Sequence, residues 1–274
     1  MKETKPKKVK STSLRWPGGK TRMIKILDEF MPEQVNKYLE VFTGGGSVLL
    51  HVIQKYNPEI VYANDIDNKL INFYETVKNN PHEIIDKCLE IKENYDKESF
   101  RTLFKTLDNE DATQFFIRNK TAYSGLYRGT YSNSTFDGCF TINSIKNLEG
   151  VSEVIKDVNF INSDFTKLDE KLPELKDFFI YLDPPYYGNK KVGLYGEDGK
   201  LHSGFDHEKL FEWIEKHSSN NKIMISYDDS PYIRELYKDY YIYNFDFVYA
   251  MTNVNGKPCT IGKEIVITNY KIEK

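Results

Sequence analysis

The residues best suited to chemistry form the run Asp183-Pro184-Pro185-Tyr186, which follows the apolar segment FFIYL. Ligands of open α/β sheets bind outside the carboxyl ends of the strands, so a strand over this segment would place Asp183 at a binding edge. The two prolines fix φ and lack N–H groups, which leaves their carbonyl oxygens to accept hydrogen bonds. Asp183 adds a second acceptor, and Tyr186 adds a ring that can stack on an aromatic base. The run therefore predicts a clamp for a ring-bound amino group.

An exocyclic amine of this kind is a poor nucleophile, because its lone pair is delocalised into the ring. Acceptors that hold both of its hydrogens favour a pyramidal nitrogen whose lone pair faces a methyl donor. The transfer would then depend on positioning and electrostatics, with no covalent enzyme intermediate and no metal ion. The competing interpretation is an ordinary turn after a strand.

A glycine turn upstream indicates a nucleotide-like ligand. Gly44, Gly45 and Gly46 separate a strand-like segment from a helix-like one, and glycine lets the backbone approach a ligand closely. About twenty residues later, Asp65 falls at the end of the next strand, where a carboxylate can accept hydrogen bonds from ribose hydroxyls. The dinucleotide fingerprint needs a further glycine where this chain has Leu49, so NAD fits poorly. S-adenosyl-L-methionine (AdoMet) has a ribose and no diphosphate, and fits better; a purely structural turn is the alternative.

Strand-like and helix-like segments alternate at both ends of the chain but not in its middle. This pattern predicts an α/β fold: a doubly wound, Rossmann-like domain with a mostly parallel sheet, helices on both faces and an antiparallel C-terminal hairpin. We assign residues 1–78 and 158–274 to this domain and residues 79–157 to a mainly helical insertion. The expected strands are 37–42, 59–66, 158–165, 177–187, 221–229, 240–250 and 264–270, and the expected helices are 47–56, 68–80, 82–107, 205–218 and 230–240.

The chain has 274 residues and a net charge of −3, with basic stretches on an acidic body. Residues 1–25 carry nine Lys or Arg against the single acid Glu3, and residues 112–136 carry Arg118, Lys120 and Arg128 with no acid. Local basic surfaces suit a phosphate-binding face, whereas a solvated tail is the plainer interpretation of the terminus. No apolar run approaches the roughly 18 residues of a membrane-spanning helix, so we expect a cytoplasmic protein.

Cysteine and histidine do not indicate another chemistry. The three cysteines are scattered, with neither a disulfide framework nor zinc-site spacing. His202 and His207 lie close in the sequence, but no cysteine or further histidine is near, so we expect no metal site. Pro258-Cys259 has the composition of a cytosine-C5 nucleophile, but it lies far downstream of the predicted catalytic strand and is interpreted as structural.

Five ordered segments together resemble the Dam-like (D12 class) DNA adenine-N6 methyltransferases. They are RWPGGK (15–20), EVFTGGGSV (40–48), YANDID (62–67), INSDF (161–165) and DPPYY (183–187). The likeness covers nearly the whole chain. It implies an enzyme that transfers a methyl group from AdoMet to the N6 amino group of a flipped-out adenine in double-stranded DNA, with a DNA-recognition role for residues 79–157.

The resemblance also implies roles for single residues. Catalysis is implied for Asp183, Pro184, Pro185 and Tyr186. AdoMet binding is implied for Trp16, Lys20, Phe42, Gly44, Gly46, Asp65, Asp164, Phe165 and Asp183. Asp164 can accept a hydrogen bond from the adenine amine of the cofactor, while Lys20 suits either a cofactor carboxylate or a DNA phosphate. A packed aromatic is the other interpretation of Trp16.

The segment YSGLYR (123–128) resembles the DNA-contacting segment of the family. Tyr123 is then implied to insert near the flipped base and Arg128 to read a guanine edge. The complete set of expected DNA contacts is Arg118, Lys120, Tyr123, Ser124, Leu126 and Arg128. GATC-specific members continue with an FNVPFG-like stretch, whereas this chain has GTYSNSTFDGCF, so GATC is not the predicted target.

Two other functions stay open: methylation of adenine or guanine in RNA, where related DPPY sites act, and an inactive relative that only binds DNA. The intact Asp183, Pro184, Tyr186 and Asp65 favour an enzyme.

We expect double-stranded DNA as the partner, with no membrane and no metal, a monomer in solution, and a restriction endonuclease as a candidate companion. The host would be a bacterium or a phage, with the protein on nucleoid DNA. Residues 186–210 form a substrate-covering loop or a plain surface connection.

Overall fold

The computed structural model describes residues 12–126, 128–172, 174–187, 204–248 and 261–272. The chain divides into two compact units. Unit 1 comprises Met1–Arg22 and Thr43–Asn162, and unit 2 comprises Met23–Phe42 and Ser163–Lys274. The glycine turn and the middle of the chain therefore belong to unit 1, and the DPPYY motif belongs to unit 2.

The strands form a mixed sheet of seven in the order β3-β2-β1-β4-β5-β7-β6. They are β1 (Lys37–Glu40), β2 (Ile60–Asp65), β3 (Val158–Asn162), β4 (Phe179–Leu182), β5 (Lys222–Asp228), β6 (Tyr241–Val248) and β7 (Ile261–Thr268). The β2–β3, β1–β4 and β4–β5 pairs are parallel, whereas β7 is antiparallel to both β5 and β6. The predicted mostly parallel sheet with an antiparallel C-terminal pair is confirmed.

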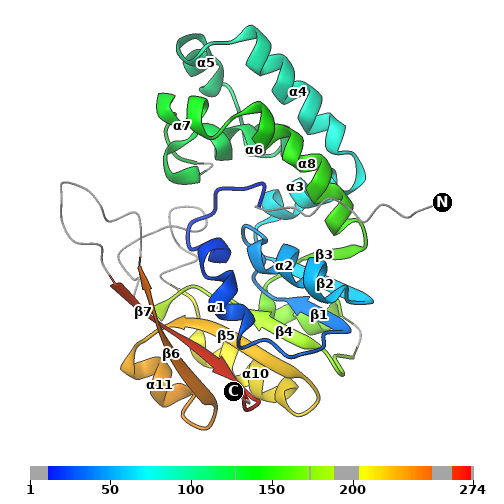
Figure 1. Ribbon diagram of the computed structural model, residues 1–274, viewed down its shortest axis with the longest axis vertical. Coiled ribbons are helices and arrows are strands. Elements are labelled where there is room, and N and C mark those ends of the chain that lie inside the picture. Colours follow the sequence, from blue (N-terminus) through cyan, green and yellow to red (C-terminus); the bar gives the residue numbers. More distant parts are fainter. Residues whose placement is uncertain (1–11, 127, 173, 188–203, 249–260, 273–274) are drawn as a thin grey trace. The chain divides into compact units, whose positions relative to one another are not determined.

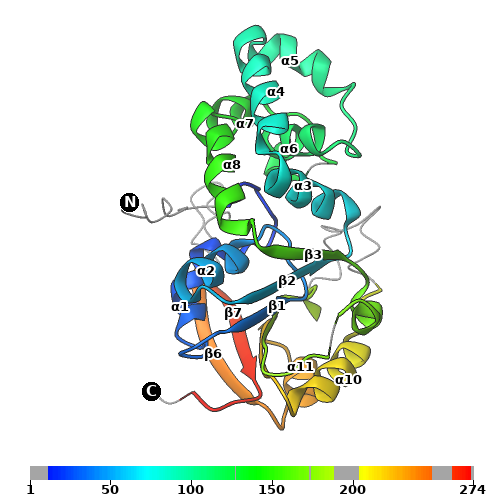
Figure 2. The ribbon, with the colours of Figure 1, turned by 90° about the vertical axis from the view of Figure 1, so that its right-hand side faces the viewer.

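Helices fill unit 1 between β2 and β3. They are α3 (Asn68–Asn79), α4 (Pro81–Asn94), α5 (Lys97–Phe104), α6 (Ala112–Thr121), α7 (Asn133–Gly138) and α8 (Ile142–Ile155), with α2 (Ser47–Tyr56) ahead of β2 and short 3-10 turns at η1 (Lys20–Arg22) and η2 (Tyr123–Gly125). Helix α3 packs on β2 and β3, and α8 packs on α2, α3 and α4 (Figures 1 and 2). The helical character expected for the middle of the chain is therefore observed, and its role in recognition stays a prediction.

The helix starts in unit 1 follow from local sequence. Pro81 stands at the first position of α4, where its missing N–H costs nothing, so it resets the helix instead of bending it. Asp96 and Ser99 form a reciprocal capping box that begins α5. The amphipathic helices expected over residues 82–107 are therefore α4 and α5. In the aromatic core of unit 1, Phe73 of α3 stacks on Phe116 of α6 with ring centroids 5.8 Å apart.

Unit 2 is built around β4, all four of whose residues are buried. Its helices are α1 (Ile24–Asp28), α10 (His207–Ser218) and α11 (Pro231–Leu236), with a 3-10 turn at η3 (Phe165–Glu170). Helix α10 packs on β5 and on η3, burying Leu210 and Ile214 (Figure 1). Asp206 caps α10 and Ser230 caps α11. None of the helices in the described ranges is long and apolar enough to cross a membrane.

Candidate functional site

The DPPYY motif follows a strand that is held on both edges. In the parallel pairs of β4, Phe179 lies opposite Tyr38 of β1 on one side and Lys222 of β5 on the other. Asp183 is the first residue beyond this strand and is half-buried, while Pro184 is buried. The sequence-predicted placement of Asp183 at the carboxyl end of a buried strand is confirmed.

The Tyr186 phenol is fixed by a carboxylate from a distant strand. Its hydroxyl donates a 2.8 Å hydrogen bond to Oε2 of Glu264 on β7, and Glu264 is only 2% exposed. Burial raises the pKa of Tyr186 well above its ordinary value, and the negative charges of Asp183 and Glu264 raise it further. The phenol is therefore protonated at physiological pH, which makes Tyr186 a donor and a ring surface and excludes it as a general base. Sequence reasoning missed Glu264, because 78 residues separate it from Tyr186.

Aromatic side chains hold the residues that follow the motif. The Tyr187 backbone N–H donates to Asp228 at the end of β5, and the Tyr187 ring stacks on Tyr232 with centroids 4.3 Å apart. Nδ1 of His207 lies 2.7 Å from the Tyr227 hydroxyl. His207 thus belongs to a hydrogen-bonded aromatic cluster, while His202, Pro258-Cys259 and residues 188–203 of the expected covering loop lie outside the described residues. Within the described ranges no three His, Cys, Asp or Glu residues are grouped as metal ligands.

Unit 2 also brings together two of the expected cofactor residues. The ring centroids of Phe42 and Phe165 lie 6.0 Å apart, and Phe205 contacts both, at 5.7 Å from Phe42 and 5.4 Å from Phe165. Asp164 caps η3: its Oδ1 accepts from the backbone N–H and the hydroxyl of Thr166, which fixes the carboxylate beside Phe165. Phe205 joins the group from the segment ahead of α10, and sequence reasoning did not identify it as part of the site.

In unit 1 the glycine turn is pinned from two sides. The Gly44 N–H donates a 2.9 Å hydrogen bond to Oδ2 of Asp65, and the Gly44 carbonyl accepts a 2.8 Å bond from the Tyr74 hydroxyl. Gly46 is the N-cap of α2 with a φ of 69°, and a Cβ there would lie 2.7 Å from that same hydroxyl. Asp65 and the turn are therefore joined directly, and Tyr74 is a further residue of this arrangement that sequence reasoning missed.

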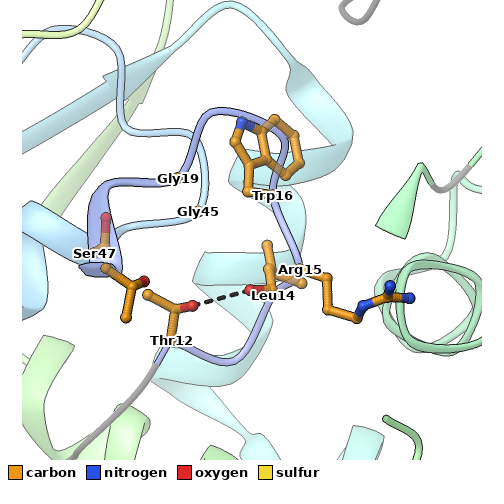
Figure 3. A pocket seen from close by; sticks show the side chains of 8 residues that line it. Thr12, Leu14, Arg15, Trp16, Gly19, Gly45 and Ser47 are labelled. Atoms are coloured by element: carbon orange, nitrogen blue, oxygen red, sulfur yellow. Dashed lines mark hydrogen bonds between the residues drawn. The ribbon is translucent and has the colours of Figure 1, made fainter. Parts of the chain in front are cut away.

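Trp16 packs directly on the turn. A Cβ on Gly44 would lie 2.7 Å from the indole Nε1, and one on Gly45 would lie 2.6 Å from the Trp16 Cβ, so only glycine admits this packing. The side chain stands over a hollow of about 180 Å³ that Arg15, Gly19 and Ser47 also line (Figure 3). Small-molecule sites usually measure roughly 300–1,000 Å³, so this hollow is too small for a whole AdoMet molecule.

Lys20 is buried beside this turn, at 4% exposure. Its backbone N–H donates to the Ser47 hydroxyl at the start of α2, and its ammonium donates a 3.0 Å bond to the Gly18 carbonyl. The lysine therefore braces the RWPGGK loop against the helix that follows the glycine turn.

The Asp65 carboxyl is strongly perturbed. Desolvation raises its pKa from 3.8 to about 6, against the lowering effect of the N–H bonds from Asp67 and Gly44. Since the folded protein holds this proton more tightly than the unfolded chain, the free energy of unfolding falls as pH rises from 3.8 to about 6.

We predict that cofactor binding weakens on acidification because Asp65 loses its charge. If the carboxylate accepts the ribose hydroxyls, the dissociation constant for S-adenosylhomocysteine should rise about tenfold per pH unit below about 6. Calorimetric titration between pH 5 and pH 8 measures this. The Asp65→Asn variant should bind S-adenosylhomocysteine weakly and with little pH dependence. If the dissociation constant of that variant changes with pH as steeply as that of the original protein, Asp65 is not the titrating group.

The expected DNA-contacting segment is a closed loop, residues 122–131. An antiparallel bridge between Ala122 and Tyr131 closes its neck, and the Tyr123 N–H donates to the Thr130 carbonyl. Tyr123 is 68% exposed, and Arg128 is exposed as well. The ring of Tyr123 is therefore accessible from outside the loop. The loop holds the four expected contacts Tyr123, Ser124, Leu126 and Arg128.

The two cations of α6 do not share this exposure. The guanidinium Nη1 of Arg118 donates to the carbonyls of Phe104 and Leu107, and the group lies 4.3 Å from the centre of the Phe104 ring. Lys120 is 6% exposed, and burial lowers its pKa to about 8. The geometry favours a packing role for Arg118, whereas Lys120 lines a hollow of about 340 Å³.

Known proteins resemble the chain over most of its length. Residues 16–251 match the D12 class N6 adenine-specific DNA methyltransferase family. Type II methyltransferase M.MjaIII of Methanocaldococcus jannaschii is 28% identical over 296 residues, covering 94% of this chain and 98% of that protein. Type II methyltransferase M1.LlaDCHI of Lactococcus lactis subsp. cremoris is 27% identical, covering 93% and 94%. DNA adenine methylase of Haemophilus influenzae is 27% identical, covering 85% of each.

The family match runs from Trp16 through the glycine turn, the helices of unit 1 and the DPPYY motif. They distinguish between the substrates that the sequence left open, because the matched family acts on adenine in DNA. The chain therefore belongs to the D12 class of N6 adenine-specific DNA methyltransferases, enzymes that take the methyl group from S-adenosyl-L-methionine.

Proposed function

We propose that the protein is a site-specific enzyme that methylates N6 of an adenine flipped out of double-stranded DNA. The observation that supports this proposal most directly is the half-buried Asp183 at the end of β4. It lies beside Tyr186, whose hydroxyl donates a hydrogen bond to Glu264. Adenine N6 is not accessible inside a duplex, so chemistry on it requires the base to leave the stack.

The residues of the DPPYY motif would bind and orient the target amine. Asp183 and the Pro184 carbonyl accept its two N–H groups, which keeps its lone pair out of the ring, and the Tyr186 ring supports the base from one face. Pro185 restricts the backbone of the loop. Since Tyr186 is protonated, the proton that N6 loses on methylation would pass by way of the Asp183 carboxylate to solvent, and not to the phenol. Catalysis then depends on preorganised acceptors at a fixed position.

The residues present fit AdoMet, which supplies an activated methyl group when it is bound. In unit 1, Asp65 would accept from the ribose hydroxyls, and the turn of Gly44 and Gly46 that it holds would lie against the cofactor. Trp16 and Lys20 would hold the adjoining RWPGGK loop in place. In unit 2, Asp164 would accept from the cofactor's adenine amine, and Phe42, Phe165 and Phe205 would pack on its ring.

The loop 122–131 would contact the DNA. Tyr123 has the exposure needed for a wedge near the flipped base, Arg128 would read a guanine edge, and Ser124 and Leu126 would contact neighbouring groups. Lys120 would bind a DNA phosphate. Its hollow is also lined by Asn143 and Ser144 in the first turn of α8, where the helix dipole favours an anion.

The biological setting is part of the same proposal. Relatives named type II methyltransferases suggest a role in protecting DNA from a companion restriction endonuclease. A single active site acting on one base at a time needs only a monomer. Since its substrate is DNA, the protein would work on nucleoid DNA in the cytoplasm of a bacterium or of a phage's host.

Unmethylated genomic DNA incubated with the purified chain and AdoMet, followed by long-read sequencing, tests this proposal. We expect N6-methyladenine at every copy of one short recurring sequence. An Asp183→Ala preparation run in parallel controls for methylation by contaminating host enzymes. Modified adenines scattered without a common sequence would contradict site specificity, and unmodified DNA would contradict the activity.

A further inference from the structure

Asn119 on α6 joins two segments that the proposed function assigns to different ligands. The side chain is fully buried. Its Oδ1 accepts a 2.9 Å hydrogen bond from the Arg15 N–H, and its Nδ2 donates to the Arg15 carbonyl at 2.9 Å and to the Gly125 carbonyl at 2.8 Å. One carboxamide therefore satisfies both backbone groups of Arg15 and one carbonyl of the loop 122–131.

A second set of contacts joins the same two segments. Nη1 of Arg15 donates a 2.9 Å bond to the Ala122 carbonyl at the neck of the loop. Gly125 has a φ of 74°, and a Cβ there would lie 2.4 Å from the Arg15 carbonyl oxygen, so the two backbones touch. In Figure 3 the guanidinium end of the Arg15 side chain points away from Trp16. These contacts hold the base of the recognition loop against residue 15.

The next residue along the chain is Trp16, which covers Gly44 and Gly45. A ligand that settles on the glycine turn and the indole would therefore restrain the backbone of residues 15 and 16. The restraint passes to the loop through the Asn119 carboxamide and the Arg15 guanidinium. All of these residues belong to unit 1.

We propose that Asn119, with Arg15, is a positioning residue that couples cofactor binding to DNA recognition. The inference rests on the proposed function, in which the turn binds AdoMet and the loop binds the target DNA. A cofactor that orders residues 15 and 16 removes part of the ordering cost that DNA would otherwise meet at the loop, so each ligand tightens the binding of the other. By linkage, the factor is the same in both directions.

The experiment measures four dissociation constants for the full chain. S-adenosylhomocysteine is titrated with and without a duplex carrying the sequenced site, and the duplex with and without S-adenosylhomocysteine. For the unaltered protein we expect each ligand to lower the dissociation constant of the other at least about fivefold. This ratio is the coupling factor. In Asn119→Ala the coupling factor should fall toward one. The dissociation constant of each ligand alone should stay within about threefold of its value for the unaltered protein.

Asn221 offers a matched control in unit 2. Its Oδ1 accepts from the Phe178 N–H and its Nδ2 donates to the carbonyls of Leu175 and His217, the same three kinds of bond in a comparably buried position. Asn221→Ala should lower the melting temperature about as much as Asn119→Ala and leave the coupling factor unchanged. If Asn119→Ala does not fold, Arg15→Met, which removes only the bond to Ala122 from a partly exposed side chain, should show a reduced factor.

The outcomes distinguish a failure of the proposed function from a failure of the proposed coupling. Absent binding of either single ligand to the unaltered protein would reject the proposed function itself. Normal single-ligand binding with a factor of one in the unaltered protein would overturn the coupling. An undiminished coupling factor in a folded Asn119→Ala or Arg15→Met variant would overturn the coupling too. The hydrogen bonds of Asn119 and Arg15 would then have a structural role alone.

Discussion

Replacing Asp183 with alanine is expected to lower the rate of methyl transfer by roughly 10²- to 10³-fold, the usual effect of removing one preorganised polar group from an active site. The carboxylate lies at the end of a strand paired on both sides, so no neighbouring side chain can shift easily to replace it. Single-turnover transfer of labelled methyl groups to DNA measures the rate, and calorimetry with S-adenosylhomocysteine should still detect cofactor binding.

Two further variants sharpen this test. Asp183→Asn keeps the shape and one acceptor oxygen but loses the charge, and it should fall between the original protein and the alanine variant. Asp239→Ala removes an exposed carboxylate from the same unit and should leave the rate unchanged. A fully active Asp183→Ala enzyme with retained fold would rule out the clamp.

The second large effect concerns the choice of site. Arg128→Ala should relax selection at one base pair of the target, because a bidentate arginine contact to guanine contributes about 1–3 kcal/mol of discrimination. The same sequencing assay reads this as methylation of sites that differ from the target at a single position. Arg128 is exposed on a loop closed at its neck, so its loss should cost little folding stability.

Arg118→Ala is the matched comparison, since both arginines were expected to contact DNA. Nη1 of Arg118 is held by the carbonyls of Phe104 and Leu107, and hydrogen bonds to a charged group contribute about 1.5–3 kcal/mol. This variant should melt at a lower temperature and keep its target sequence. If instead Arg118→Ala changes the sequence and Arg128→Ala does not, the two roles are reversed.

The features visible in the sequence are those whose partners lie close along the chain or at the ends of successive strands. Apolar periodicity located the strands, and the spacing from Gly44 to Asp65 corresponds to one βαβ step, which places the carboxylate beside the turn. Pro81 likewise acts within one helical turn, at the start of α4. Local chemistry determines these features, so local patterns predict them.

Other parts of the site depend on contacts that no local pattern encodes. Glu264 reaches Tyr186 only because β7 pairs beside β5, and Phe205 meets Phe42 and Phe165 although the three residues lie far apart in the sequence. The burial of Lys120 had the same origin. Helix α6 is covered on nearly every side, so Lys120 is buried although its place in a run of cations indicated a basic surface.

One competition experiment tests the central claim most directly. Unmethylated duplex DNA and total RNA are mixed at equal nucleotide concentration, incubated with the chain and methyl-labelled AdoMet, digested to nucleosides and separated by chromatography. We predict that the label elutes with N6-methyldeoxyadenosine and that Asp183→Ala removes it. Label in a methylated ribonucleoside, or in a deoxynucleoside other than N6-methyldeoxyadenosine, would contradict the account.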